Sequence, residues 1–247
     1  RSAGPVQPAR WVSASRTFRC DASLVQGELW KWTKESSQPR FASSQAATGG
    51  KDSIFAHESA NIEALVANIV RGAFEYQGQK CSAASRAYIP DTLWPRVKER
   101  LCDEIATIKV GDVCDFRNFM NAVIDKAAFK TICEYIEFAK QDPNMEILCG
   151  GKYDDRNGYF IQPTIVESKN PRSKLMSEEI FGPVLTVYVY PRGAFEEAME
   201  LCNTTSPYAL TGAIFAQDRF ASVKAVKALR NAAGNFYIND KPPGAVV

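Results

Sequence analysis

The sequence predicts an α/β domain over residues 46–247, built on a largely parallel, twisted sheet with flanking helices. Strand and helix patterns alternate along this whole stretch. Apolar residues recur with the spacing of one helical face over residues 62–74, and short apolar runs separate the later helical segments. Alternation of this kind is typical of parallel sheets, because a parallel strand is reached through a crossover connection.

The first elements follow a pair of glycines. A short strand is expected at residues 53–56, followed by Ser59 as the residue that caps the next helix. The helix itself is predicted over 62–74, where apolar residues fall at i, i+3, i+4, i+7 and i+8. Gly78 breaks the pattern.

The remaining elements continue the alternation up to the end of the chain. Pro90 stops the next strand, and Pro143 follows the longest helical segment. The expected elements in chain order are a strand at 86–89, helices at 93–105 and 121–139, strands at 145–149, 159–166 and 184–190, a helix at 194–202, a strand at 211–215, a helix at 219–230 and a strand at 235–238.

Residues 1–45 show no sustained period and are interpreted as an irregular N-terminal extension. The first twenty residues contain Arg1, Arg10, Arg16 and Arg19, several serines and alanines, and no acidic residue. This composition resembles a mitochondrial import segment or its remnant, and a disordered basic arm is the alternative. The resemblance predicts a protein of the mitochondrial matrix.

The charge balance argues against two classes of partner. Thirty Lys and Arg residues nearly match 28 Asp and Glu residues, with no long run of one sign. Such a balance gives no basic surface for nucleic acid. No apolar stretch approaches the roughly 18 residues of a membrane-spanning helix. The chain is therefore expected to be soluble, or bound to something through its surface.

The chain has seven cysteines but no C-x-x-C pair, and its single histidine is His57. A zinc site would need four thiolates from scattered positions, so no metal is expected. Free thiols in a reducing compartment are the prediction. The cysteines are Cys20, Cys81, Cys102, Cys114, Cys133, Cys149 and Cys202.

Cys81 is the strongest candidate for chemistry among these thiols. It follows a predicted helix and a turn that contains Gly78. Nearby cationic groups and oriented N–H dipoles lower the pKa of a thiol in such a place, which would activate it as a nucleophile. A cysteine that packs as a small hydrophobic residue is the alternative.

Residues 78–83, Gly-Gln-Lys-Cys-Ser-Ala, resemble the nucleophile loop of aldehyde dehydrogenases, in the form typical of pyrroline-5-carboxylate (glutamate semialdehyde) dehydrogenases. Further segments resemble that family in the same order, at 74–76, 178–184 and 229–240. The resemblance covers roughly residues 46–247. It implies the catalytic-domain fold of aldehyde dehydrogenases.

The resemblance implies a role for several residues. Cys81 matches the nucleophile that attacks the aldehyde, and the charge of Lys80 would favour its thiolate. Ser82 matches a residue that contacts the substrate carboxylate. Glu179 matches the carboxylate that holds the nicotinamide ribose, since it can accept from two hydroxyl groups. Phe181 matches the aromatic residue beside the nicotinamide.

The chain also departs from the family pattern. Ala47 stands where the family has a glutamate that acts as general base, and loss of such a base typically lowers the rate by about 10²–10⁴-fold. Gly244 and Ala245 match the loop that receives the substrate, but Ala245 replaces a serine. The resemblance further implies a catalytic domain truncated at the C-terminus and a missing N-terminal domain for NAD.

Three hypotheses of function remain open. The first is a catalytically inactive enzyme relative, with no cofactor, which serves as an accessory subunit of a larger mitochondrial assembly. The alternative is NAD-dependent oxidation of glutamate semialdehyde to glutamate in proline catabolism, with the missing half supplied elsewhere. The third is a thiol-based sensor that uses Cys81.

Overall fold

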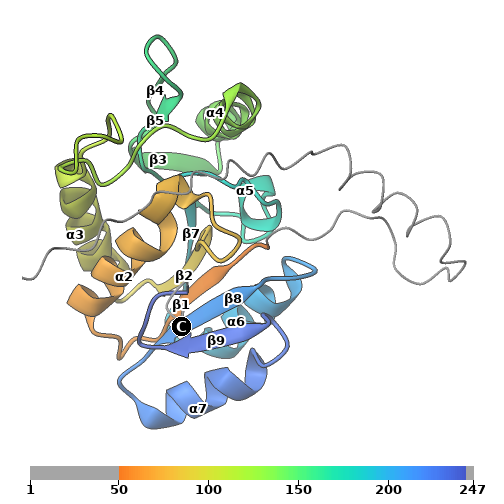
Figure 1. Cartoon of the computed structure of the whole chain (residues 1–247). Helices are drawn as coiled ribbons and strands as arrows, with labels where there is room; N and C mark the ends of the chain where they lie inside the picture. Colours follow the sequence, from red (N-terminus) through yellow and green to blue (C-terminus); the bar gives the residue numbers. More distant parts are fainter. Residues whose placement is uncertain (1–49, 243–247) are drawn as a thin grey trace, which may run out of the picture. The chain divides into compact units, whose positions relative to one another are not determined.

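A computed structural model describes residues 50–242 of the chain. Its main sheet has seven strands in the order β3-β6-β7-β2-β1-β8-β9 (Figure 1). Every neighbouring pair is parallel except β3 with β6, which is antiparallel. The expectation of an α/β fold with a largely parallel sheet is confirmed.

The strand positions agree closely with the sequence pattern. The seven strands are β1 (Ser53–Ala56), β2 (Arg86–Pro90), β3 (Met145–Cys149), β6 (Thr164–Ser168), β7 (Val184–Tyr190), β8 (Thr211–Phe215) and β9 (Asn235–Ile238). A separate two-stranded ribbon pairs β4 (Tyr153–Asp154) with β5 (Phe160–Ile161).

Helices cover both faces of the sheet (Figure 1). On one face, α2 (Ile62–Phe74) and α3 (Trp94–Thr107) pack on sheet residues such as Ile54, Ala87 and Leu185. The other face carries α4 (Lys126–Gln141), α5 (Lys174–Ser177), α6 (Phe195–Thr204) and α7 (Arg219–Ala228). There Phe55 and Tyr88, the neighbours of Ile54 and Ala87, pack under α6 and α7. Successive strand residues alternate between the two layers, as the pleat of a strand requires.

The cap of α2 differs from the expectation. Asn61, not Ser59, is the N-cap, and its side chain accepts a hydrogen bond of 2.9 Å from the backbone N–H of Ala64. The Ser59 hydroxyl instead accepts from the backbone N–H groups of Gln217 and Asp218, at 3.1 and 2.9 Å. Ser59 therefore ties the start of α2 to the segment after β8.

The helix expected from residue 121 begins five residues later, at Lys126, with Asp125 as its N-cap. The reason is tertiary. The backbone N–H of Asn121 donates to the Gln77 side chain, and that of Ile124 donates to the Gln79 side chain. These bonds hold the backbone of the segment outside the helix, so its apolar residues do not join it.

The strand expected over 159–166 is two strands, β5 and β6. Gln162 and Pro163 separate them, and proline has no N–H for a sheet ladder. The sequence pattern missed β4 and α5, whose two and four residues are too few to show a period. Within residues 50–242, no helix is both long enough and apolar enough to cross a bilayer.

Truncation of Ile54 should test the central layer of the core. Ile54 has no exposed surface, so Ile54→Ala should lower the free energy of unfolding by about 2–5 kcal/mol. Ile124→Ala is the matched control, because 77% of the Ile124 surface is exposed. Urea unfolding followed by circular dichroism measures both. Equal midpoints for the two variants would contradict the burial of Ile54.

Candidate active site

The segments that carry the family motifs meet at the amino edge of the sheet. The loop with Cys81 leads into β2, and the segment with Glu179 leads into β7. Strands β2 and β7 are parallel neighbours, with Arg86 opposite Thr186. Ligands of open α/β sheets usually bind at the opposite, carboxyl edge. This candidate site therefore differs from the usual ligand site of such sheets, because it lies at the amino edge.

Two loops touch through a pair of glycines at this edge. Gly78 has a φ of 65°, and a Cβ atom there would lie 2.5 Å from the carbonyl oxygen of Gly182. Gly182 in turn lies against the side chain of Ile132 in α4. Glycine at position 78 thus lets the backbone of the Cys81 loop reach the backbone that follows Phe181.

Cys81 is exposed and lies in the turn between α2 and β2. The expectation of a loop position after a long helix is confirmed. The N–H of Ala83 donates to the carbonyl of Lys80 at 3.0 Å and closes this turn. Ser82 is half-buried, and its carbonyl accepts from the Thr211 hydroxyl at 3.1 Å. The turn is therefore anchored to β8 directly beside the thiol.

The backbone before the thiol is strained. Tyr76, Gln77 and Gly78 have φ values of 55°, 59° and 65°, in the left-handed region that residues with a side chain rarely adopt. The buried side chain of Gln77 offsets this strain by hydrogen bonds to the 121–124 segment, where the Ala122 carbonyl accepts and the Asn121 N–H donates. Strain of this kind persists only where surrounding contacts hold it.

Lys80 forms an ion pair in the structure. Its Nζ lies 3.1 Å from a carboxylate oxygen of Glu75. The same oxygen is 2.8 Å from Nζ of Lys241, and the other oxygen pairs with Arg71 at 2.7 Å. The expected effect of the Lys80 charge on the thiol of Cys81 stays a prediction. Glu75 joins the end of α2, the Cys81 turn and the segment after β9.

The surroundings of Glu75 shift its acidity. Burial acts to raise its pKa, but hydrogen bonds from Lys241, Arg71 and Lys80 outweigh that effect and lower the pKa from 4.5 to about 2. Glu75 is consequently charged in the folded protein at all physiological pH values. Sequence reasoning missed it, because its partners Lys80 and Lys241 are 5 and 166 residues away.

A group of buried charges lies under the same edge. Lys51, Asp52 and Arg86 are each at most 1% exposed. Arg86 Nε donates to the Lys51 carbonyl at 2.9 Å, and one Asp52 carboxylate oxygen accepts from the Thr211 N–H at 2.6 Å. Within the described part of the chain, Lys51 Nζ and Asp52 Oδ2 are buried without a hydrogen-bond partner.

Burial shifts the pKa values of Lys51 and Asp52 toward 7. It lowers the pKa of Lys51 to about 7, with the charge of Arg86 acting in the same direction. It also raises the pKa of Asp52 to about 7, against hydrogen bonds from the backbone of Thr211 and Leu210. The sequence could have indicated Lys51 and Asp52, because they directly precede β1, whose four residues are all buried.

Glu179 and Phe181 lie in the segment directly before Gly182, the residue that Gly78 touches. Glu179 is half-buried. Burial raises its pKa, while a hydrogen bond from the Gly50 backbone and the charge of Lys51 act against that shift. Phe181 has a φ of 55° and is 38% exposed. An accessible carboxylate and an accessible ring thus flank the contact of Gly78 with Gly182.

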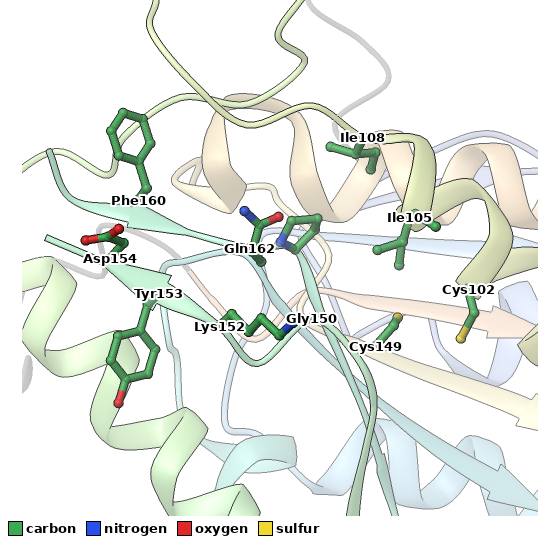
Figure 2. A pocket seen from close by; sticks show the side chains of 12 residues that line it. Cys102, Ile105, Ile108, Cys149, Gly150, Lys152, Tyr153, Asp154, Phe160 and Gln162 are labelled. Carbon is green, nitrogen blue, oxygen red and sulfur yellow. The ribbon is translucent and has the colours of Figure 1, made fainter. Parts of the chain in front are cut away.

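Three candidate residues from the sequence lie outside the described residues 50–242. They are Ala47, Gly244 and Ala245. Across residues 50–242, no three His, Cys, Asp or Glu side chains gather as a metal site. A cavity of about 640 Å³ is found elsewhere, between α3 and strands β3 to β6, and neither Cys81 nor Glu179 lines it (Figure 2).

Comparison with known proteins decides the family. The sequence profile of the Aldehyde dehydrogenase family matches residues 31–247. The chain belongs to this family. It is 58% identical over 200 residues to the mitochondrial delta-1-pyrroline-5-carboxylate dehydrogenase of Dictyostelium discoideum, covering 81% of this chain and 36% of that protein. It is 50% identical over 225 residues to the Homo sapiens protein of the same description, covering 89% and 39%.

Solved aldehyde dehydrogenase structures have the same fold. The NAD-bound delta-pyrroline-5-carboxylate dehydrogenase of Mycobacterium tuberculosis superposes with a TM-score of 0.78 at 44% identity, covering 91% of this chain and 41% of that chain. Lactaldehyde dehydrogenase from Escherichia coli gives a TM-score of 0.73 at 28% identity, covering 78% and 39%. The chain thus spans about two fifths of the length of these relatives.

A substitution at Gly78 should separate the cost of a left-handed backbone conformation from the cost of a clash with the Gly182 carbonyl. Gly78→Ala places a Cβ against the Gly182 carbonyl, whereas Gly193, with a φ of 86°, has nothing within 4 Å of its Cβ position. Gly193→Ala should therefore cost only the left-handed conformation, about 1–2 kcal/mol. Gly78→Ala should cost more, measured by urea unfolding. It should also change the rate of Cys81 alkylation, which Gly193→Ala should leave unchanged. Equal effects would mean that the two loops do not touch.

Replacement of Glu75 should change how stability depends on pH. Because the pKa of Glu75 is lowered from 4.5 to about 2 on folding, its carboxylate stabilises the fold above about pH 4.5, and this contribution disappears as the pH falls toward 2. Glu75→Gln should therefore lose about 2–3 kcal/mol near pH 7 and converge with the parent protein at low pH.

Glu134→Gln is the control for this measurement. Glu134 pairs with Lys130 on the surface of α4, with 66% of its side chain exposed. A pair of this kind contributes at most about 1 kcal/mol. Thermal unfolding at a series of pH values records both variants. A pH-independent difference between Glu75→Gln and the parent would show that the three cations do not act on Glu75.

Proposed function

We propose that this chain is the cysteine-bearing part of an NAD-dependent dehydrogenase that oxidises glutamate semialdehyde to glutamate. The observation that carries the proposal is the exposed Cys81 on a turn braced from α2, β8 and the 121–124 segment, with Glu179 and Phe181 beside it. The similarity to pyrroline-5-carboxylate dehydrogenases supports this substrate. These relatives favour the enzymatic alternative over the inactive accessory subunit that the sequence analysis put first.

The residues at the edge fit one part of NAD, the nicotinamide with its ribose. Glu179 is a half-buried carboxylate whose oxygens can accept from two hydroxyl groups, and Phe181 offers an accessible ring. The contact between Gly78 and Gly182 keeps both close to the Cys81 turn. Bound NAD would supply the hydride acceptor.

The chain's own part in the reaction centres on Cys81. Its sulfur would add to the aldehyde carbon of the substrate, and after oxidation the carbon would remain bound to the sulfur as a thioester until water hydrolyses it. Ser82, the half-buried neighbour of Cys81, would donate its hydroxyl to the substrate carboxylate. The braced turn keeps the thiol from moving during attack, and fixed orientation of reacting groups is worth about 7–11 kcal/mol.

Ala47 favours a second candidate, an inactive accessory subunit of a mitochondrial assembly. An alanine cannot take a proton from the water that hydrolyses the thioester. In the enzymatic proposal the same residue makes hydrolysis slow while leaving attack by Cys81 intact. A location in the mitochondrial matrix fits both candidates, because the similar proteins are described as mitochondrial.

Formation of NADH from glutamate semialdehyde should test the proposal on the protein purified at its natural length. We expect slow turnover that Cys81→Ser abolishes. Cys114→Ser should leave turnover unchanged, since Cys114 is also exposed but lies on a different loop. Ala47→Glu should raise turnover by about 10²–10⁴-fold, because a base for hydrolysis is restored.

The accessory-subunit candidate predicts a different pattern. No NADH would form in the parent protein, in Ala47→Glu or in Cys81→Ser. That result would overturn the enzymatic proposal. A first turnover without later ones, removed by Cys81→Ser, would instead support it and identify hydrolysis as the blocked step.

A further inference from the structure

Two cysteines lie together at one end of the cavity between α3 and β3 (Figure 2). Cys102 comes from the middle of α3, and Cys149 is the last residue of β3. Both are half-buried, and both are free thiols. The two thiols are neighbours, since Cys102 is among the groups that raise the pKa of Cys149, after burial. Neither residue takes part in the proposed active site.

An irregularity in β3 turns Cys149 toward Cys102. Ile147 pairs with Val166 and Cys149 with Ile165, so Leu148 is an extra residue opposite the same two positions. A bulge of this kind re-aims the side chain that follows it. Regular alternation would point Cys149 to the same side as Ile147, which packs in the layer of α4. Instead, both Leu148 and Cys149 pack in the layer of α2 and α3.

The cavity gives small molecules access to this pair. Its volume of about 640 Å³ exceeds what a peroxide needs. The polar side chains of Lys152, Asp154 and Gln162 also line it. We propose that Cys102 and Cys149 form a dithiol site that hydroperoxides oxidise to an intramolecular disulfide between α3 and β3.

The oxidation takes two steps, and they balance in the same way whichever of the two sulfurs reacts first. With Cys102 first, its sulfur attacks one peroxide oxygen, the O–O bond breaks, and the thiol proton leaves with the alcohol or water. Cys149 sulfur then attacks the sulfenic acid of Cys102, the S–O bond breaks, and water leaves. The two sulfurs together lose two electrons, which reduce the peroxide.

Mass spectrometry of the full chain tests this site. The protein is treated with hydrogen peroxide, its remaining thiols are blocked with N-ethylmaleimide, and it is digested without reduction. We expect a peptide of α3 joined to a peptide of β3, with label lost from Cys102 and Cys149 in equal proportion. Dithiothreitol should restore both labels. The midpoint of thermal unfolding should rise on oxidation, because the cross-link restricts the unfolded chain.

Matched variants decide between this pair and general thiol oxidation. Cys102→Ser and Cys149→Ser should each abolish the linked peptide and the rise in unfolding temperature. Cys114→Ser, which removes an exposed thiol elsewhere, should keep both. The proposal is overturned if Cys102 and Cys149 are oxidised independently to sulfinic acids, if both keep their label at peroxide levels that oxidise Cys81, or if the linked peptide joins either of them to Cys81.

Discussion

The candidate site depends on charges buried beneath the amino edge of the sheet. The carbonyl of Asp52 accepts from the backbone N–H groups of Ser85 and Arg86, at 3.1 and 3.2 Å, and its carboxylate accepts from Thr211. Arg86 returns a bond to the carbonyl of Lys51. Removal of one partner from such a group strands a buried charge, which typically costs about 3–5 kcal/mol. Strands β1, β2 and β8 are thereby held in register where the Cys81 turn begins and ends.

The turn that carries Cys81 is held by contacts of a different kind from the buried charges beneath it. Three successive residues have left-handed backbone conformations, and side-chain amides from the same turn bind the backbone of residues 121–124. Glu75 adds ion pairs to α2 and to Lys241. The turn is therefore braced from several elements at once. This bracing explains how an exposed thiol can keep one orientation at the edge of a sheet.

The cysteines of this chain lie in different environments of one fold. Cys81 stands on a strained turn in contact with solvent, whereas Cys202 belongs to α6 and is fully buried beside Ser53. Cys102 and Cys149 share a cavity wall on the opposite layer of the sheet. Burial raises the pKa of both Cys149 and Cys202. Cys102 adds to the rise at Cys149, whereas the charge of Arg86 and a hydrogen bond with Ser53 act against it at Cys202.

The sequence by itself determined the elements whose burial follows a local period. The face of α2, the short buried strands and the loop position of Cys81 all follow from the spacing of apolar residues and from glycine. Only the tertiary structure decided which distant partner several polar groups take. Ser59 binds the backbone of Gln217 and Asp218, Gln77 and Gln79 bind the segment before α4, and Glu75 pairs with Lys241. The spacing of apolar residues along the chain indicates which side chains are buried. A hydrogen bond or ion pair between distant residues depends instead on which segments the fold brings within about 3 Å.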